Sequence, residues 1–244
     1  MFSEWLTQST GAMFRRTWQQ VKHWPSLCLV CHAWPSQVVC ESCVAQFAQP
    51  KHRCPTCALP TPRGEPCPAC QQARPPLDAC LCAVDYDYPW ADCVGQFKFQ
   101  GHPGLARTLA ELMRHAPWVE PALENAHSII PMPLSLKRLS ERGFNQSQEL
   151  VRHLAPDKAD PYTLRRLERG PHQVGQNKAQ RQANVRGSFW LDPQRLGHIQ
   201  GRRLVLVDDV MTTGASLFEA AQTLRTAGAT HITGLVFART APLS

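Results

Sequence analysis

From about residue 76 onward, short apolar runs alternate with segments in which apolar residues recur every three or four positions. The short runs are expected to form strands, at 79–88, 128–133 and 204–207. The longer periodic segments predict helices, at 105–115, 145–154 and 217–227. Strands that alternate with helices are typical of a mostly parallel sheet with helices on both faces. The sequence therefore predicts an α/β domain over residues 76–244.

The first 26 residues have a different pattern, in which Trp and other apolar residues stand among basic and polar ones at loosely helical spacing. We interpret residues 1–26 as an N-terminal helical extension that docks on the rest of the protein. Adhesion to a membrane surface is the alternative. The sequence contains no transmembrane segment and no secretory signal, so a cytoplasmic protein is expected.

Composition changes this picture only in part. Of 244 residues, 43% are hydrophobic and 18% are charged, which permits a sizeable core and argues against a wholly disordered chain. The formal net charge of +7 favours polyanionic partners such as phosphate esters or nucleic acid.

Between the extension and the α/β domain lies a segment rich in cysteine and proline. Eight of the chain's 11 cysteines form four C-x-x-C pairs: Cys28 and Cys31, Cys40 and Cys43, Cys54 and Cys57, and Cys67 and Cys70. Each pair places two sulfurs on one side of a tight turn, and two pairs supply the four thiolates that a structural zinc ion prefers. Residues 27–75 are therefore predicted to form a double zinc ribbon with two structural Zn²⁺ ions. A redox dithiol relay or a labile cluster is the alternative.

The pairing of these cysteines is open between two arrangements. Sequential pairing joins the first four in one site and the last four in another, whereas a cross-braced arrangement interleaves them. The short connections favour sequential pairing. Cys80, Cys82 and Cys93 fall outside the pattern, and the first two are expected to be buried in a strand.

The segment Val205–Ser216 carries the chemistry of a phosphate-ester site. An apolar strand is followed by Asp208 and Asp209, which are expected at the carboxyl end of the strand, where open α/β sheets bind ligands. Hydroxyl donors and a glycine then precede a helix, an arrangement that suits a phosphate group. The acids can accept hydrogen bonds from two ribose hydroxyls or help to hold Mg²⁺. The binding residues are predicted to be Asp208, Asp209, Thr212, Thr213, Gly214, Ala215 and Ser216. The alternative is an acidic turn cap and an ordinary loop into a helix.

This ordered combination resembles the signature with which phosphoribosyltransferases bind phosphoribosyl pyrophosphate (PRPP). Together with the cysteine pairs, it makes the chain resemble the ComF family, a double zinc ribbon followed by a phosphoribosyltransferase-like domain. Three further segments match the family's patterns in order: 97–102, 131–146 and 173–189. Gln176 departs from the pattern, since the family usually has an apolar residue there.

The resemblance implies a type I phosphoribosyltransferase-like sheet that binds PRPP, or a related ribose phosphate, together with Mg²⁺. It also implies that residues 134–142 face the pyrophosphate half of PRPP, with Lys137, Arg138 and Arg142 as charge partners. Residues 165–186 resemble the hood over such a site, or form a basic flexible loop.

The family's association with DNA uptake and competence implies single-stranded DNA or DNA-uptake proteins as partners. The basic residues that would contribute are Arg165, Arg166, Arg169, Lys178, Arg181 and Arg186. Two functions follow: a binding or accessory role at the PRPP pocket, which we favour, and transfer of phosphoribosyl from PRPP to a nitrogen acceptor. No catalytic residue can be named from the sequence, because no general base stands out.

Overall fold

The computed structural model describes residues 26–167 and 186–241. The chain divides into two compact units, residues 1–46 and residues 47–244. The predicted helical extension therefore lies outside the described residues, apart from Ser26. The same holds for Arg169, Gln176, Lys178 and Arg181 of the predicted hood.

The described part of the first unit is a small ribbon. Ser26 and Ser36 form an antiparallel bridge, in which the Ser26 N–H donates to the Ser36 carbonyl at 2.7 Å. The Cys28–Cys31 turn lies between them, and the second pair of cysteines leads into helix α2 (Glu41–Phe47). The predicted order of turn, ribbon and second pair is thus present in a segment of about two dozen residues, too short to build a sizeable apolar core.

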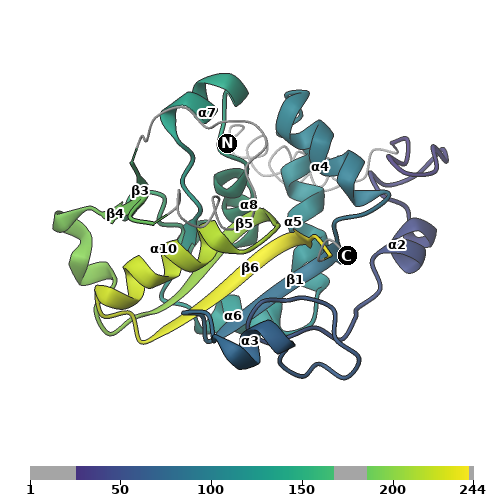
Figure 1. Ribbon diagram of the computed structural model, residues 1–244. Helices are drawn as coiled ribbons and strands as arrows, with labels where there is room; N and C mark the ends of the chain where they lie inside the picture. Colours follow the sequence, from purple (N-terminus) through teal and green to yellow (C-terminus); the bar gives the residue numbers. More distant parts are fainter. Residues whose placement is uncertain (1–25, 168–185, 242–244) are drawn as a thin grey trace, which may run out of the picture. The chain divides into compact units, whose positions relative to one another are not determined.

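The second unit is built on a four-stranded sheet in which all neighbours are parallel (Figure 1). Its strands, in spatial order, are β1 (Ala79–Asp85), β6 (His231–Arg239), β5 (Arg203–Met211) and β2 (Ser128–Pro131). Residues 204–207 of β5 are all buried, as predicted for a strand that is covered on both faces.

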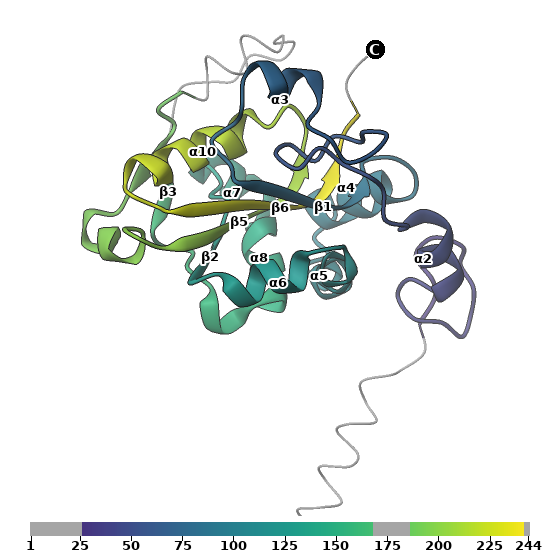
Figure 2. The same cartoon turned by 90° about the horizontal axis from the view of Figure 1, so that it is seen from below.

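Helices cover both faces of this sheet, which confirms the predicted α/β class. The α-helices that begin and end within the described part of this unit are α3 (Pro68–Gln72), α4 (Trp90–Phe99), α5 (Leu105–His115), α6 (Val119–Asn125), α7 (Leu136–Arg142), α8 (Gln146–Leu154) and α10 (Ala215–Thr226). Figure 2 shows the sheet nearly edge-on, with α3 and α10 on one face and α5, α6 and α8 on the other. Short 3₁₀ turns lie at Pro156–Lys158 and Pro193–His198.

A separate antiparallel pair, β3 (Leu164–Arg166) and β4 (Phe189–Leu191), flanks the segment predicted as a hood. The sequence analysis did not anticipate this pair, because strands of three residues give too short a pattern to detect. No helix in the described part of the chain has the length and apolar character needed to span a bilayer.

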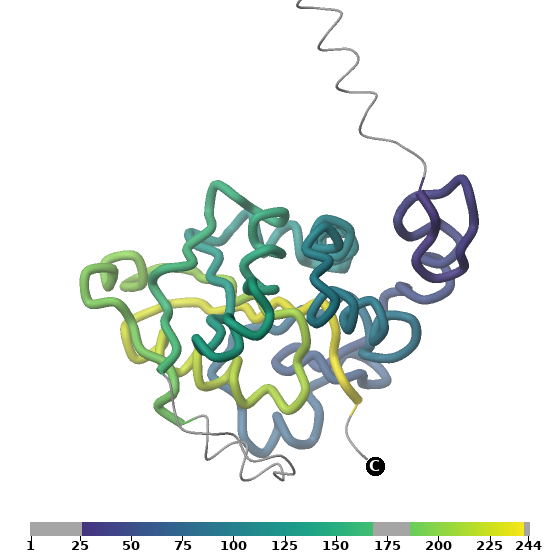
Figure 3. The backbone as a smooth tube through the Cα atoms, turned by 90° about the horizontal axis from the view of Figure 1, so that it is seen from above, coloured from purple at the N-terminus to yellow at the C-terminus, as the bar shows by residue number. Residues whose placement is uncertain are grey.

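The second cysteine-rich segment belongs to the larger compact unit, and Figure 3 traces the backbone of that segment in blue. Cys54 and Cys57 are buried in one apolar cluster with Leu77, Met211 and Leu217, which belong to the α10 side of the sheet. The two predicted ribbons therefore fall in different compact units.

Several predicted boundaries differ from the structure. The strands expected at 79–88 and 128–133 end at Asp85 and Pro131, and the helix expected at 217–227 spans Ala215–Thr226. The largest difference is in β5. The strand expected to end at Val207 continues through the acidic pair to Met211. The physical reason is continued pairing with β6, because Asp208 is opposite Val236 and Met211 is opposite Arg239. Asp208 and Asp209 therefore lie within the last residues of β5, where pairing with β6 fixes the direction of their side chains.

Candidate functional site

Asp208 and Asp209 lie near the carboxyl end of β5, and each is held by a different neighbour. The Ser147 hydroxyl, in the first turn of α8, donates to Asp208 Oδ1 at 2.9 Å. The Asp209 N–H donates to the same oxygen at 3.0 Å. The Asp208 carboxylate is therefore fixed in direction before any ligand binds.

The Asp209 carboxylate forms an ion pair with Lys98, whose Nζ lies 2.9 Å from Oδ1. Lys98 is in the last turn of α4, and both side chains are largely buried. One cation, Lys98, therefore lies beside two neighbouring carboxyl groups.

Burial and the neighbouring Asp209 carboxylate raise the pKa of Asp208 to about 7, although Lys98 and the Ser147 hydroxyl act in the opposite direction. A carboxyl group in this range changes its charge close to neutral pH. A bound cation, or hydroxyl donors from a ligand, would favour its ionised form.

Helix α8 is oriented by its own N-terminal cap. Asn145 Oδ1 accepts from the Ser147 N–H at 3.0 Å and from the Gln148 N–H at 3.4 Å. Its Nδ2 donates to the Met132 carbonyl at 3.0 Å, directly after β2. The cap thus ties the first turn of α8 to the end of β2 and places Ser147 against Asp208.

The loop that follows β5 turns into α10 at Gly214. Gly214 has φ of 82° and is the N-cap of α10. A Cβ at this position would lie 2.5 Å from Met211 Cε and 2.6 Å from Phe218 Cζ, so a larger residue is disfavoured by the positive φ and would also displace these two side chains. The Ala215 N–H is 3.3 Å from Thr213 Oγ1, Thr212 is exposed, and Ser216 is in the first turn of α10. The positive end of the α10 dipole therefore faces this loop.

Arg239, the last residue of β6, supports the loop from inside the protein and is only 4% exposed. Its Nη1 donates to the carbonyls of Met211 at 3.0 Å and of Thr240 at 2.9 Å, and also to that of Thr212. Its Nε donates to the Cys57 carbonyl at 2.9 Å. A buried cation therefore contacts the loop, where it favours an anion.

The three predicted pyrophosphate partners all lie on α7 but differ in their surroundings. Arg138 and Arg142 line a pocket of about 260 Å³ together with Lys98, Phe99, Gly101 and Glu141. The Arg142 guanidinium lies 5.2 Å from the centre of the Phe99 ring and donates to Gln146 Oε1 at 3.0 Å. Lys137 is exposed and pairs with Glu141 at 4.0 Å. The structure thus brings two of the three cations to the pocket that contains Lys98.

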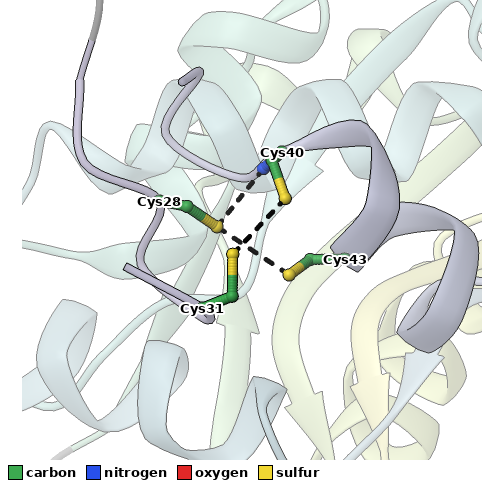
Figure 4. A group of neighbouring side chains, drawn as sticks. All are labelled: Cys28, Cys31, Cys40 and Cys43. Atoms are coloured by element: carbon green, nitrogen blue, oxygen red, sulfur yellow. Dashed lines mark hydrogen bonds between the residues drawn. The ribbon is translucent and has the colours of Figure 1, made fainter. Parts of the chain in front are cut away.

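The first four cysteines form one cluster, drawn in Figure 4 with the sulfurs turned toward one another. All four sulfurs lie within 4.8 Å of one another. The Cys40 N–H donates to Cys28 Sγ at 3.4 Å. Burial opposes ionisation of Cys28, but hydrogen bonds from backbone N–H groups outweigh it and lower the pKa to about 6.

Cys54, Cys57, Cys67 and Cys70 form a second cluster, whose sulfurs also lie within 4.8 Å of one another. The Cys67 N–H donates to Cys54 Sγ at 3.3 Å, which repeats the contact between Cys40 and Cys28. Backbone and side-chain hydrogen bonds lower the pKa of Cys54 to about 6 in spite of its burial.

Both clusters follow the sequential pairing that the short connections favoured. Four convergent thiols with N–H donors to sulfur can hold a metal ion, and four sulfurs at these distances are consistent with tetrahedral zinc. The eight cysteines of the two clusters form no disulfides in the described structure.

Three residues of the site were missed by the sequence analysis: Lys98, Ser147 and Arg239. Lys98 was noticed only as part of the segment 97–102 that resembles the family. Ser147 stands at the start of a predicted helix, where a serine is usually interpreted as part of the helix cap. Arg239 stands at the end of the last strand, where a basic residue is typical of the surface.

Curated relatives match most of the chain, although no protein-family model matches it. The DNA utilization protein YhgH of Salmonella typhimurium is 31% identical over 218 residues, which cover 85% of this chain and 94% of the relative. Competence protein F of Haemophilus influenzae is 32% identical over 174 residues, which cover 68% and 75%. Competence protein ComFC of Bacillus subtilis is 27% identical over 198 residues, which cover 78% and 79%.

Solved structures give more distant matches. The allosteric regulatory enzyme of purine biosynthesis has 18% identity and a TM-score of 0.36, and the match covers 55% of this chain and 25% of that one. A hypoxanthine phosphoribosyl transferase of Trypanosoma cruzi has 12% identity and a TM-score of 0.35, with 57% and 65% covered. On the strength of the curated relatives and the two four-cysteine clusters, the chain belongs to the ComF family of competence and DNA utilization proteins.

Proposed function

We propose that the end of β5 and the loop 212–216 bind the ribose 5-phosphate group of PRPP. The observation that carries this proposal is the joint position of an oriented acidic pair and a glycine loop, within one segment from Asp208 to Ser216. Phosphate in the loop would meet backbone N–H groups and hydroxyls at the start of α10. The two ribose hydroxyls would donate to the carboxylates.

The pocket beside Lys98 is suited to the pyrophosphate half of the same ligand. Arg138 and Arg142 can form paired N–H contacts to phosphate oxygens, and Lys98 supplies a third positive charge. Mg²⁺ would accompany the pyrophosphate and offset its charge, with Asp208 or Asp209 available as oxygen ligands. A pocket of about 260 Å³ lined mainly by charged side chains suits a phosphate group better than an apolar base.

Titration calorimetry tests this site. PRPP with Mg²⁺ is added to the wild type, to Asp208→Asn with Asp209→Asn, and to the control Asp157→Asn, which changes an exposed aspartate in a 3₁₀ turn. Binding to the wild type and to the control, with loss in the double variant, is expected. Equal binding to all three proteins would contradict the proposal.

We place this binding in DNA uptake or utilisation, in a binding or accessory role, and the names of the relatives, a DNA utilization protein and a competence protein, support this placement. Transfer of phosphoribosyl to a nitrogen acceptor is the alternative. The lining of the pocket favours the binding role, since it offers charges for pyrophosphate but few faces for a base. Pyrophosphate release with any member of a nucleobase panel would establish transfer instead.

Contact with single-stranded DNA is favoured by a row of arginine and aromatic side chains at the β3–β4 pair. Arg165 and Arg195 place their guanidinium carbons 5.7 Å and 5.0 Å from the centre of the Tyr162 ring. Trp190 lies opposite Arg165 in the antiparallel register, so the two side chains share a face. Tyr162 and Trp190 are 52% and 41% exposed. Exposed rings next to arginines can stack on bases while the cations attract the backbone.

Fluorescence anisotropy with a labelled oligothymidine checks this contact. Tyr162→Ala and Trp190→Ala should each weaken binding about tenfold, on the order of one lost stacking contact. Trp118→Asn is the control, because Trp118 is an exposed aromatic residue in another element and asparagine tolerates its φ of 68°. An equal effect of all three variants would contradict a role for this row.

We further propose that each four-cysteine cluster holds one structural Zn²⁺. The first unit has too few described apolar residues for an independent core, so a metal would supply its folding free energy. Metal analysis of the purified protein should return close to two zinc ions per chain, and a folded chain without zinc would contradict this assignment.

A further inference from the structure

We propose that the second cysteine cluster, through Arg239, holds the phosphate loop in its binding conformation, so that ribose-phosphate affinity depends on the metal in that cluster. The inference rests on the proposed function of the loop 212–216. It assigns Arg239 as a positioning residue and gives the two metal clusters different roles.

The guanidinium of Arg239 joins three parts of the larger unit. It donates to the Cys57 carbonyl in the turn of the second cluster and to the Met211 and Thr212 carbonyls at the start of the loop. Because a guanidinium is planar and rigid, a shift of the Cys57 turn would reach the loop as a shift of the same hydrogen-bonded group. The side chain is 4% exposed, so water is a poor substitute for any of these partners.

A second set of contacts connects the same elements. The Cys80 N–H, in β1, donates to the Pro55 carbonyl of the cluster turn at 2.7 Å. Cys80 Sγ lies 3.8 Å from Met211 Sδ. Met211 in turn lies against Gly214, since a Cβ on that glycine would be 2.5 Å from Met211 Cε. The path from Pro55 to Gly214 therefore consists of packed and hydrogen-bonded groups.

The turn that carries the Cys57 carbonyl is itself shaped by the cluster. Cys54 and Cys57 occupy one C-x-x-C turn, closed by the Ala58 N–H, which donates to the Cys54 carbonyl at 2.9 Å. Without a metal, no ligand bonds join the four sulfurs of this cluster, and their positions depend on the surrounding chain alone. Loss of the metal would then move the Cys57 carbonyl away from Arg239.

The first cluster provides a matched comparison. It belongs to the other compact unit, and the contacts of Arg239 that the structure describes all lie in the larger unit. Cys31 and Cys70 are the more accessible members of their clusters, as exposed and half-buried residues respectively. Replacing either by serine changes one atom and removes one of four thiol ligands.

The experiment compares Cys70→Ser, Cys31→Ser and the wild type by zinc content, by PRPP titration with Mg²⁺, and by hydrogen exchange of the peptide that spans 210–216. Each variant should lose one of two zinc ions. We expect Cys70→Ser to bind PRPP at least tenfold more weakly and to exchange faster in 210–216, whereas Cys31→Ser should match the wild type in both. Equal behaviour of the two variants would overturn the inference.

Arg239→Lys tests the link between the second cluster and the loop 212–216 while both metal sites stay intact. Lysine retains the charge but has a single terminal nitrogen, so it cannot contact the Cys57 and Thr212 carbonyls in the manner of a guanidinium. Two zinc ions with weakened PRPP binding and faster exchange in 210–216 are expected. Unchanged affinity and exchange would overturn the role of Arg239.

Two further measurements distinguish failure of this inference from failure of a variant to fold and from failure of the proposed function. If Cys70→Ser does not fold, the zinc that remains in Cys31→Ser is removed with a chelator, and exchange in 210–216 is compared with that of the amides of residues 128–130 in β2. A larger rise in 210–216 supports the inference, and a rise no larger than in β2 overturns it. If the wild type does not bind PRPP, the proposed function fails, while the exchange data still decide whether the cluster holds the loop.

Discussion

Lys98 Nζ lies 2.9 Å from Asp209 Oδ1, and this ion pair joins the last turn of α4 to the carboxyl end of β5. Both side chains are largely shielded from water. The contact places a cation between the acidic pair and the pocket that contains Arg138 and Arg142. Lys98 can therefore balance Asp209 in the free protein and face pyrophosphate in a complex.

Removal of this lysine should be costly. Lys98→Met leaves a buried carboxylate without its partner, which should lower the free energy of unfolding by about 3 kcal/mol. Denaturant unfolding measures the change. Adding Asp209→Asn to Lys98→Met should recover part of the loss, because the unpaired charge is then absent.

The control for this prediction is Lys137→Met, which removes an exposed lysine that pairs with Glu141 at 4.0 Å. Its effect should stay within about 0.5 kcal/mol. Equal losses for Lys98→Met and Lys137→Met would show that the buried pair contributes no special stability.

The raised pKa of Asp208 predicts a pH dependence of stability. With a pKa of about 7 in the folded protein against an ordinary value of 3.8, the folded state binds more protons than the unfolded state between these two values. The contribution of this group to the free energy of unfolding therefore falls as pH rises through that window, and the loss is complete above about pH 7.

Asp208→Asn removes this titration but keeps an oxygen that can accept from Ser147. The variant should gain stability relative to the wild type as pH rises, by on the order of 2 kcal/mol at pH 8 and by little at pH 4, with the full shift discounted for partial exposure. Denaturant unfolding at both pH values measures the difference. A pH-independent difference between the two proteins would contradict the raised pKa.

A side chain at position 214 should destabilise the loop. Gly214→Ala places a Cβ at a positive φ and within 2.6 Å of Phe218 Cζ, so it should cost about 1–3 kcal/mol and weaken PRPP binding. Thermal unfolding and calorimetry measure both effects. Gly197→Ala is the control, because a Cβ there meets nothing within 4 Å. Unchanged stability and PRPP binding in Gly214→Ala would contradict the claim that the loop favours glycine at this position.

The parts of this structure that sequence could predict are those encoded within one continuous segment. Helix α5 has the predicted bounds, Leu105–His115, because an amphipathic pattern and the flanking residues define both ends. The acidic pair and Gly214 also stand in one short segment. The two cysteine clusters follow from pair spacing, since each C-x-x-C turn is local.

The remaining parts depend on contacts between distant segments. Lys98 meets Asp209 only because α4 ends beside the carboxyl end of β5. Arg239 is buried because the turn at Cys57 covers the end of β6, and its sequence position alone resembles an exposed strand end. The extension of β5 to Met211 likewise required its partner strand, since two adjacent aspartates are unfavourable in a strand on propensity alone.

The central claim is that β5 and the loop after it bind ribose 5-phosphate, and calorimetric titration of PRPP with Mg²⁺ tests it most directly. Saturable binding to the wild type and to Asp157→Asn, lost in Asp208→Asn with Asp209→Asn, is the predicted result. Absence of binding to the wild type, or undiminished binding to the double variant, would contradict the claim.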